Sequence, residues 1–135
     1  MNLLGRTKIV PSIVPTAGAT GTATATVIDC AGFDRVCHVI AIGAAGGAST
    51  FDYKVQECAT SNGTYSDIDD AALTQVASSG ANKVYAIDVP VNAAKPFQKA
   101  VAAVGTAAFA NAAVAVLYEG SGTYPKTAAA QAIII

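Results

Sequence analysis

Charged side chains are scarce in this chain of 135 residues. They make up 13% of the sequence, and the net charge is −1, whereas about a quarter is usual in soluble domains. Binding to nucleic acid or to an anionic membrane depends on clustered Lys and Arg, so this composition argues against both functions. A surface so poor in charge favours a protein that lies against other protein, because a free monomer relies on charge for solubility. The alternative is a monomer with an Ala, Thr and Ser surface.

Histidine and tryptophan are also nearly absent, with one His and no Trp. A cupin-type metal site needs several imidazoles, and His38 is alone. Cys37 precedes it directly and is expected on the opposite face of a strand, so the two side chains are badly placed for a nucleophile–base pair. We therefore predict that His38 is a core or interface residue whose ring nitrogens are hydrogen-bonded.

Cysteine occurs three times, at Cys30, Cys37 and Cys58. The number is odd and no C-x-x-C spacing is present, which argues against a disulfide framework. We predict buried, reduced thiols that behave as small hydrophobes and react slowly in the native protein, and folding in a cytoplasm.

Long apolar runs and catalytic motifs are missing as well. The N-terminus has no apolar region of signal-peptide length, and no run approaches the roughly 18 apolar residues that a membrane span requires. The glycine-rich residues 43–47 (GAAGG) are not followed by the Lys-Ser/Thr of a phosphate-binding loop. With no acid, base and nucleophile set, the sequence predicts a protein that is not an enzyme, with no catalytic residues and no cofactor.

One acidic cluster, residues 67–70 (DIDD), is dense enough to consider for Ca²⁺. The EF-hand pattern fails, because Ala71 and Ala72 occupy positions that need an oxygen ligand and a glycine. A solvated turn is the preferred interpretation, a different kind of Ca²⁺ site is the alternative, and no metal ligands are predicted.

Residues 51–67 (FDYKVQECATSNGTYSD) contain the clearest hairpin pattern. Phe51, Tyr53 and Val55 alternate with polar residues, a period of two that is typical of a strand with one buried face. A turn is expected at residues 61–64 (SNGT), because Asn-Gly tolerates the positive φ angles of a tight reversal. The chain is predicted to return as a second strand after this turn.

Other short apolar segments alternate with Gly, Asn and Ser turns, which predicts an antiparallel β-sandwich over residues 20–119, either jelly-roll-like or immunoglobulin-like. The predicted strands are residues 20–30, 35–42, 83–91, 97–104 and 111–119. Residues 35–42 (RVCHVIAI) are apolar on both faces, so this strand is expected at the centre of a sheet, covered by the second sheet and, as one option, by a partner.

Two segments leave a helical alternative open. The region 99–117 is rich in Ala, the best helix former, although its Val residues favour two strands. Residues 69–76 are ambiguous, since Asp69 and Asp70 are suited to cap a short helical turn.

The two ends of the chain are predicted to be an extended N-terminal arm (residues 1–19) and a C-terminal tail (residues 120–135). Two prolines confine the first apolar segment to a sheet edge or an extended arm. The apolar side chains of both ends lack polar alternation, so we expect a partner surface to cover them, with folding back onto the chain's own sandwich as the alternative. These predicted interface residues are Ile9, Val10, Ile13, Val14, Ile133, Ile134 and Ile135.

Three segments together resemble a pattern found in small virion proteins of tailed bacteriophages. Residues 51–57 (FDYKVQE) match a strand of the form F-x-x-x-x-Q-E, and residues 64–68 (TYSDI) resemble a strand of the form Tyr-x-Asp-Val after a polar turn, with Ile68 in place of the Val. Residues 96–101 (PFQKAV) resemble the aromatic-basic strand that follows. The chain departs from the pattern in a longer turn with Cys58 at a usual serine, and in Gln98-Lys99 where more arginine is typical.

This resemblance implies a capsid decoration (cement) protein or another head-associated protein. Its partner would be the major capsid protein, and the protein would be made in the host cytoplasm and lie on the outside of the phage capsid. A homo-oligomer, a dimer or trimer, is also expected. A carbohydrate- or receptor-binding module of jelly-roll type is the alternative. That module would present an exposed aromatic platform or a bound Ca²⁺, for which the sequence gives no clear signal.

Overall fold

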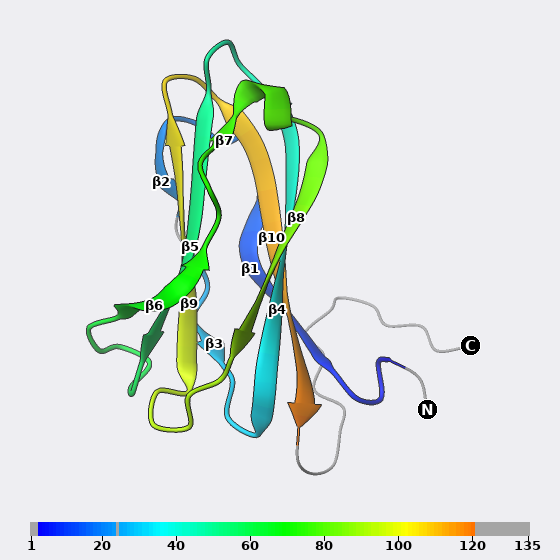
Figure 1. Ribbon diagram of the computed structural model, residues 1–135, viewed down its shortest axis with the longest axis vertical. Coiled ribbons are helices and arrows are strands. Elements are labelled where there is room, and N and C mark those ends of the chain that lie inside the picture. Colours follow the sequence, from blue (N-terminus) through cyan, green and yellow to red (C-terminus); the bar gives the residue numbers. More distant parts are fainter. Residues whose placement is uncertain (1–2, 24, 121–135) are drawn as a thin grey trace.

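Short strands account for most of the chain that the computed structural model describes, residues 3–23 and 25–120 (Figure 1). The elements are β1 (Lys8–Thr16), β2 (Gly21–Ala23), β3 (Ile28–Asp29), β4 (Phe33–Ala45), β5 (Thr50–Cys58), β6 (Ser66–Ala72), β7 (Val76–Ala77), the 3₁₀ turn η1 (Ser78–Gly80), β8 (Lys83–Pro90), β9 (Phe97–Gly105) and β10 (Phe109–Gly120). No helix within these described residues is long and apolar enough to cross a membrane.

The strands form two antiparallel sheets that pack face to face, which confirms the predicted all-β sandwich (Figure 1). We call the first the β4 sheet, with strand order β1-β10-β4-β8. The second is the β5 sheet, with order β2-β9-β5-β6, in which β3 also pairs with β9 and β7 with β5. Strand spacing had left the connection order open. The structure shows that the chain changes sheet repeatedly, and that β5 and β6 are paired neighbours in sequence, as the hairpin pattern predicted.

The core lies between the inner faces of the two sheets. Phe51, Tyr53 and Phe109 provide its largest apolar side chains, and their rings contact one another, Phe51 stacking on Tyr53 and meeting Phe109 edge-to-face. Alanine fills many of the remaining inner positions. The buried alanines of the two facing strands are Ala100, Ala102, Ala113 and Ala115. Small side chains at these positions let the sheets approach closely around the three aromatic rings.

The Ala-rich segment 99–117 is two strands rather than a helix. Buried and more exposed residues alternate strictly in β9 and over residues 109–118 of β10, the pattern of a sheet with one face inside. The high helix propensity of Ala is overridden here because these strands bury their small side chains against the opposite sheet. The expectation that residues 35–42 occupy a sheet centre is also confirmed, since β4 lies between β10 and β8.

The predicted N-terminal arm differs from the structure over residues 8–16. This segment is β1, an edge strand of the β4 sheet that pairs with β10. Ile13 is buried in the main core and Val10 packs against a smaller cluster, so both lie inside the chain's own sandwich. Ile9 lies opposite Val116 and is partly buried, while Val14 is exposed. The two prolines are accommodated because β1 has a partner on one side only and its pairing is interrupted by register shifts.

Two further predictions need correction. The strand expected over residues 20–30 is two short strands, β2 and β3, which both pair with β9. The helical turn considered for residues 69–76 is instead the end of β6, with β7 following it. Here β6 bulges: Lys54 is opposite Ala72 while Gln56 is opposite Asp67, so the intervening β6 residues loop out of register. The predicted interface residues Ile133, Ile134 and Ile135 lie outside the described residues.

Candidate functional site

The single histidine belongs to a buried chain of hydrogen bonds between the two sheets. His38 on β4 is fully buried; its Nδ1 lies 3.1 Å from Tyr53 Oη and its Nε2 lies 3.1 Å from Gln98 Oε1. Gln98 Oε1 only accepts, so the Nε2–H donates to it and a neutral ring accepts the Tyr53 hydroxyl proton at Nδ1. Ser12 Oγ lies 3.3 Å from Tyr53 Oη. Because the Tyr53 proton is donated to His38, the Ser12 hydroxyl donates to Tyr53 Oη and ends the chain of hydrogen bonds. The prediction of a core histidine with both ring nitrogens bonded is confirmed.

Burial sets the protonation of this cluster. Desolvation lowers the pKa of His38, partly opposed by its hydrogen bond to Gln98. Desolvation also raises the pKa of Tyr53 to about 12. Both groups are therefore neutral at physiological pH and have no contact with solvent from which a substrate would come. The cluster orients the two sheets and offers no general base to a bound molecule.

The three cysteines are free, and they differ in burial. Cys30 and Cys58 are buried, and desolvation raises the pKa of Cys30 to about 12. Cys37 is only partly buried and faces away from His38, on the other side of β4. Desolvation raises its pKa too. The expectation of buried thiols therefore holds for Cys30 and Cys58, while Cys37 lies at a surface.

The acidic cluster takes part in surface pairing. Asp67 accepts from Lys54 Nζ and from Gln56 Nε2, both at 2.7 Å, and the bond to Lys54 is the main reason that its pKa is lowered. Asp69 and Asp70 are exposed on the β6 bulge. Within residues 3–23 and 25–120 no group of three His, Cys, Asp or Glu side chains is arranged to hold a metal ion.

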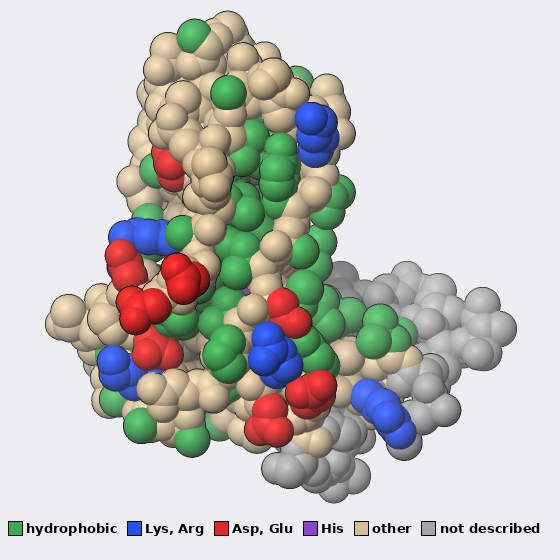
Figure 2. Space-filling view, in the orientation of Figure 1, with side chains coloured by type: hydrophobic (Ala, Val, Ile, Leu, Met, Phe, Trp, Pro, Cys, Tyr) green, Lys and Arg blue, Asp and Glu red, His purple; other side chains and the backbone are tan. Residues whose placement is uncertain are grey.

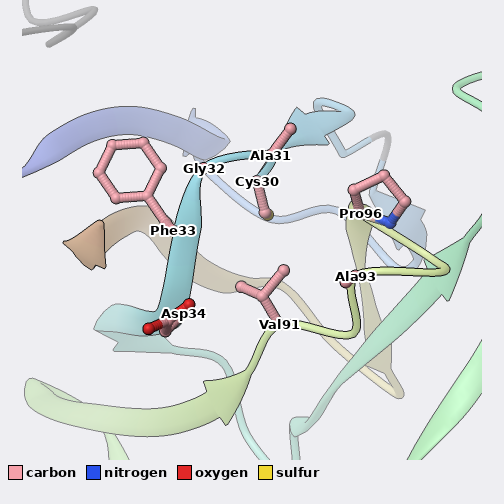
Figure 3. Close-up of a pocket in the computed structure, with 8 residues that line it drawn as sticks. All are labelled: Cys30, Ala31, Gly32, Phe33, Asp34, Val91, Ala93 and Pro96. Carbon is pink, nitrogen blue, oxygen red and sulfur yellow. The ribbon is translucent and has the colours of Figure 1, made fainter. Parts of the chain in front are cut away.

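A cavity of about 250 Å³ lies at one end of the sandwich (Figure 3). Its lining residues are Cys30, Ala31, Gly32, Phe33, Asp34, Val91, Ala93 and Pro96. Figure 3 shows the start of β4 on one side and the connection between β8 and β9 on the other. The walls are mainly apolar, Asp34 is the one charged side chain of the lining, and the Cys30 thiol is kept protonated by its raised pKa. This lining has no nucleophile paired with a base.

The outward-facing side of the β4 sheet is apolar over most of its area, with the polar side chains of Arg35, Asp88 and Tyr118 at one end. Residues directly opposite in antiparallel strands share a face, so the register of β1, β10, β4 and β8 defines this surface. We call it the outer face: Ile9, Pro11, Val14, Cys37, Val39, Ala41, Val84, Ala86, Ala110, Ala112, Val114 and Val116. Its most exposed members are Val84 at 68%, Val14 at 64% and Val114 at 41% exposure. Such exposure of valine on one sheet marks a surface suited to contact with another molecule.

The outward side of the β5 sheet is different, because charged side chains form pairs across it. Lys54 bonds to Asp67 at 2.7 Å, and Gln75 Nε2 donates to Asp52 Oδ2 at 2.9 Å. Lys99 Nζ lies 4.3 Å from the ring centre of Tyr65. The described charges are therefore distributed unevenly between the two sides of the sandwich, and the outer face is the side with little charge.

One polar cluster lies on the same side of the β4 sheet, at one end of the outer face, where Asp88 is opposite Cys37 and Arg35 is opposite Tyr118. Arg35 Nε lies 3.2 Å from Asp88 Oδ1 and 3.1 Å from Tyr118 Oη, and the Tyr118 hydroxyl donates to Asp88 Oδ2. The bond to Asp88 raises the pKa of Tyr118, and the bond to Tyr118 is the main reason that the pKa of Arg35 is raised. The three side chains satisfy one another, which leaves no unpaired charge in this cluster.

The sequence predicted only part of the outer face. The sequence predicted that residues 35–42 are apolar on both sides, and β4 is the centre of the outer face. It did not indicate that Val84 and Val114 lie on the same face, since that depends on which strands are neighbours. No protein-family model and no curated protein matches the chain.

Proposed function

We propose that this protein is a non-enzymatic structural protein of a phage virion, which binds the outside of the capsid and stabilises contacts between subunits of the major capsid protein. The outer face of the β4 sheet is the proposed docking surface. The single observation that carries the proposal is the contrast between this apolar face and the charged outward side of the β5 sheet. The resemblance of residues 51–57, 64–68 and 96–101 to small virion proteins supplies the kind of partner.

The size of the face indicates how such binding works. Four strands about 4.8 Å apart and about six residue steps of 3.4 Å along β10 give a patch of roughly 300 Å². At about 25 cal/mol per Å², covering it contributes about 7 kcal/mol, of the same order as the cost of association. One such contact is therefore weak, and a repeating capsid surface that engages several copies strengthens it through avidity.

The alternative, a carbohydrate- or receptor-binding module, has less support. Sugar binding of that kind uses an exposed aromatic platform, and Tyr118, the aromatic residue that borders the outer face, is engaged with Asp88 and Arg35. No cluster for Ca²⁺ is present among the described residues.

Sedimentation of lysates from cells that produce the protein tests the proposal. We expect mass spectrometry to find the native chain in the fractions that contain capsid-sized particles. Ala41 is exposed at the centre of the outer face, so Ala41→Lys places a charge where the partner docks and is expected to reduce the sedimenting fraction at least tenfold.

Ala103→Lys is the matched control. Ala103 lies on β9, in the interior of the β5 sheet, opposite Asp52, so a lysine there adds the same charge to the other side of the sandwich. This variant is expected to sediment like the native chain. Absence of the native chain from all particle fractions contradicts the proposed function, and equal loss in both variants contradicts the assignment of the outer face.

A further inference from the structure

The four outer edges of the two sheets are not equally protected against pairing with another strand. Natural sheets block their edges with prolines, bulges and very short strands. The β1 edge carries Pro11 and Pro15. The β2 and β3 edge is split into strands of three and two residues. The β6 edge bulges, and Asp70 within it has a positive φ of 61°.

The β8 edge has none of these protections over most of its length. Its eight residues, Lys83–Pro90, pair with β4 in an unbroken register, and the proline is the last of them. Val91 N–H donates to the Asp34 carbonyl at 2.8 Å, so Val91 belongs to the row of residues whose backbone faces β4. The backbone N–H and C=O groups of successive residues in a strand point to opposite sides. Those of Val84 and Ala86 therefore point away from β4, toward the open edge.

Apolar side chains lie beside this open edge. Figure 2 shows a hydrophobic band between β6–β7 and β8, where the sandwich is open. Tyr85 and Ile87 of β8, and Ile68 and Leu73 on the other side, are partly buried against the core. A cavity of about 170 Å³ between β6 and β8 adjoins the band, and its lining combines Ile68 and Ile87 with the carboxylates of Asp69, Asp70 and Asp88. A strand added beyond β8 both pairs its backbone and shields these side chains.

We propose that this strand is β8 of a second copy, paired antiparallel about a two-fold axis near Ala86. An antiparallel self-pair suits the side chains of β8, because this axis sets Tyr85 of one copy opposite Ile87 of the other, an aromatic and a β-branched residue on the same face of the sheet. Lys83 is then opposite Val89 and Asp88 opposite Val84, so no like charges face each other. The small side chain of Ala86 lies at the centre, where the two copies meet.

The paired sheets form one continuous eight-stranded sheet, in which the two outer faces adjoin. The patch grows from roughly 300 to roughly 600 Å², closer to the ~800 Å² per partner of a standard interface. This consequence rests on the proposed function, whereas the pairing itself does not. The edge contact alone is small, so the dimer is expected to be concentration-dependent.

Sedimentation velocity of the full chain over roughly 1–200 µM tests the pairing. The mass is expected to rise from 13.4 kDa toward twice that value. In Ala86→Pro the lost N–H is one that points to the open edge, so the pairing of β8 with β4 is kept while the dimer weakens at least tenfold. Circular dichroism and the melting temperature verify that this variant is folded.

A cross-linking variant keeps the test decisive if Ala86→Pro does not fold. In a Cys37→Ser background, Ala86→Cys is expected to form a disulfide-linked dimer under mild oxidation, because the two-fold axis brings the two copies of residue 86 together. Ala41→Lys is expected to remain dimeric while losing particle binding, which separates this inference from the proposed function. A monomer at all concentrations, a dimer that is lost in Ala41→Lys but unchanged in Ala86→Pro, or failure of the residue 86 cross-link contradicts the pairing.

Discussion

His38 is neutral inside the sandwich because desolvation lowers its pKa, and this gives the stability a defined pH dependence. The unfolded chain binds a proton at this residue as the pH falls below about 6.5, whereas the folded chain does not until the lower folded pKa is reached. The contribution of His38 to the free energy of unfolding is therefore expected to be constant above pH 7. Below pH 6.5 this contribution decreases as the pH falls. The facing groups, Tyr53 and Gln98, do not titrate in this range.

Urea titrations at pH 7.5, 6.5, 5.5 and 5.0 measure this dependence. His38→Gln is the control, and its free energy of unfolding is expected to vary less over the same interval, whatever its absolute value. The lowered pKa of Asp67 acts in a separate, more acidic range, since the ordinary value of an Asp is about 3.9. A free energy that rises on acidification from pH 6.5 to 5.0 contradicts a buried neutral His38.

Gly18 is a second residue whose identity the fold requires. Its φ is 69°, a Cβ built there lies 1.8 Å from the Phe109 carbonyl oxygen, and Phe109 N–H donates to the Gly18 carbonyl at 2.9 Å. Gly18→Ala is expected to destabilise the protein by at least about 2 kcal/mol, through backbone strain and loss of this hydrogen bond.

Gly47→Ala is the matched control for this substitution. A Cβ at Gly47 meets no atom within 4 Å, so the change in the free energy of unfolding is expected to stay within about 0.5 kcal/mol. Chemical denaturation of both variants gives the comparison, and equal effects would rule out a special requirement for glycine at position 18.

Among the elements, β1 shows the limit of prediction from sequence. Its two prolines are compatible with an edge strand and with a free arm, because neither has to supply a complete ladder of N–H donors. What decides between them is the contact of Ile13 with the core and the pairing with β10, which depend on segments far away in the sequence. The strand at residues 51–57 was predictable because its apolar and polar residues alternate. The strands at 83–91 and 97–104 were predictable because each is a short segment rich in Val, Ile, Phe or Tyr bounded by turn residues.

Deletion of residues 1–15 is expected to destabilise the sandwich, because it removes β1. It takes away the buried side chains of Ser12 and Ile13 and exposes the edge of β10. Burial of one isoleucine is worth on the order of 1.5–3 kcal/mol, so a decrease of at least about 3 kcal/mol in the free energy of unfolding is expected by chemical denaturation. An unchanged free energy would restore the interpretation of this segment as an arm.

Deletion of residues 127–135 is expected to act differently. The sequence predicts that Ile133, Ile134 and Ile135 contact a partner, so the melting temperature stays nearly unchanged while co-sedimentation with capsid-sized particles weakens. Unfolding of this variant with no specific loss of binding would mean that the tail is part of the sandwich.

At the scale of the whole molecule, the two sides of the sandwich have different chemistry. Charged side chains such as Lys54, Asp67 and Lys99 lie on the outward side of the β5 sheet. The outer face of the β4 sheet is apolar, and the Arg35–Asp88 pair lies at one end of it. Composition predicted a protein with little surface charge that lies against other protein, but not the side on which charge is missing. That side follows from the strand order, in which Val84 and Val114 flank β4 from two neighbouring strands.

Cys37 gives the most direct test that the outer face is the docking surface, because it lies on that face and is partly exposed, whereas Cys30 and Cys58 are buried. Its pKa is raised, so thiol labelling is measured at about pH 8.5 to increase the thiolate fraction. Labelling of Cys37 is expected to slow at least tenfold when the protein is bound to capsid-sized particles, with Cys30 and Cys58 slow in both states. Equal labelling of Cys37 in the free and the particle-bound protein would contradict docking through the outer face.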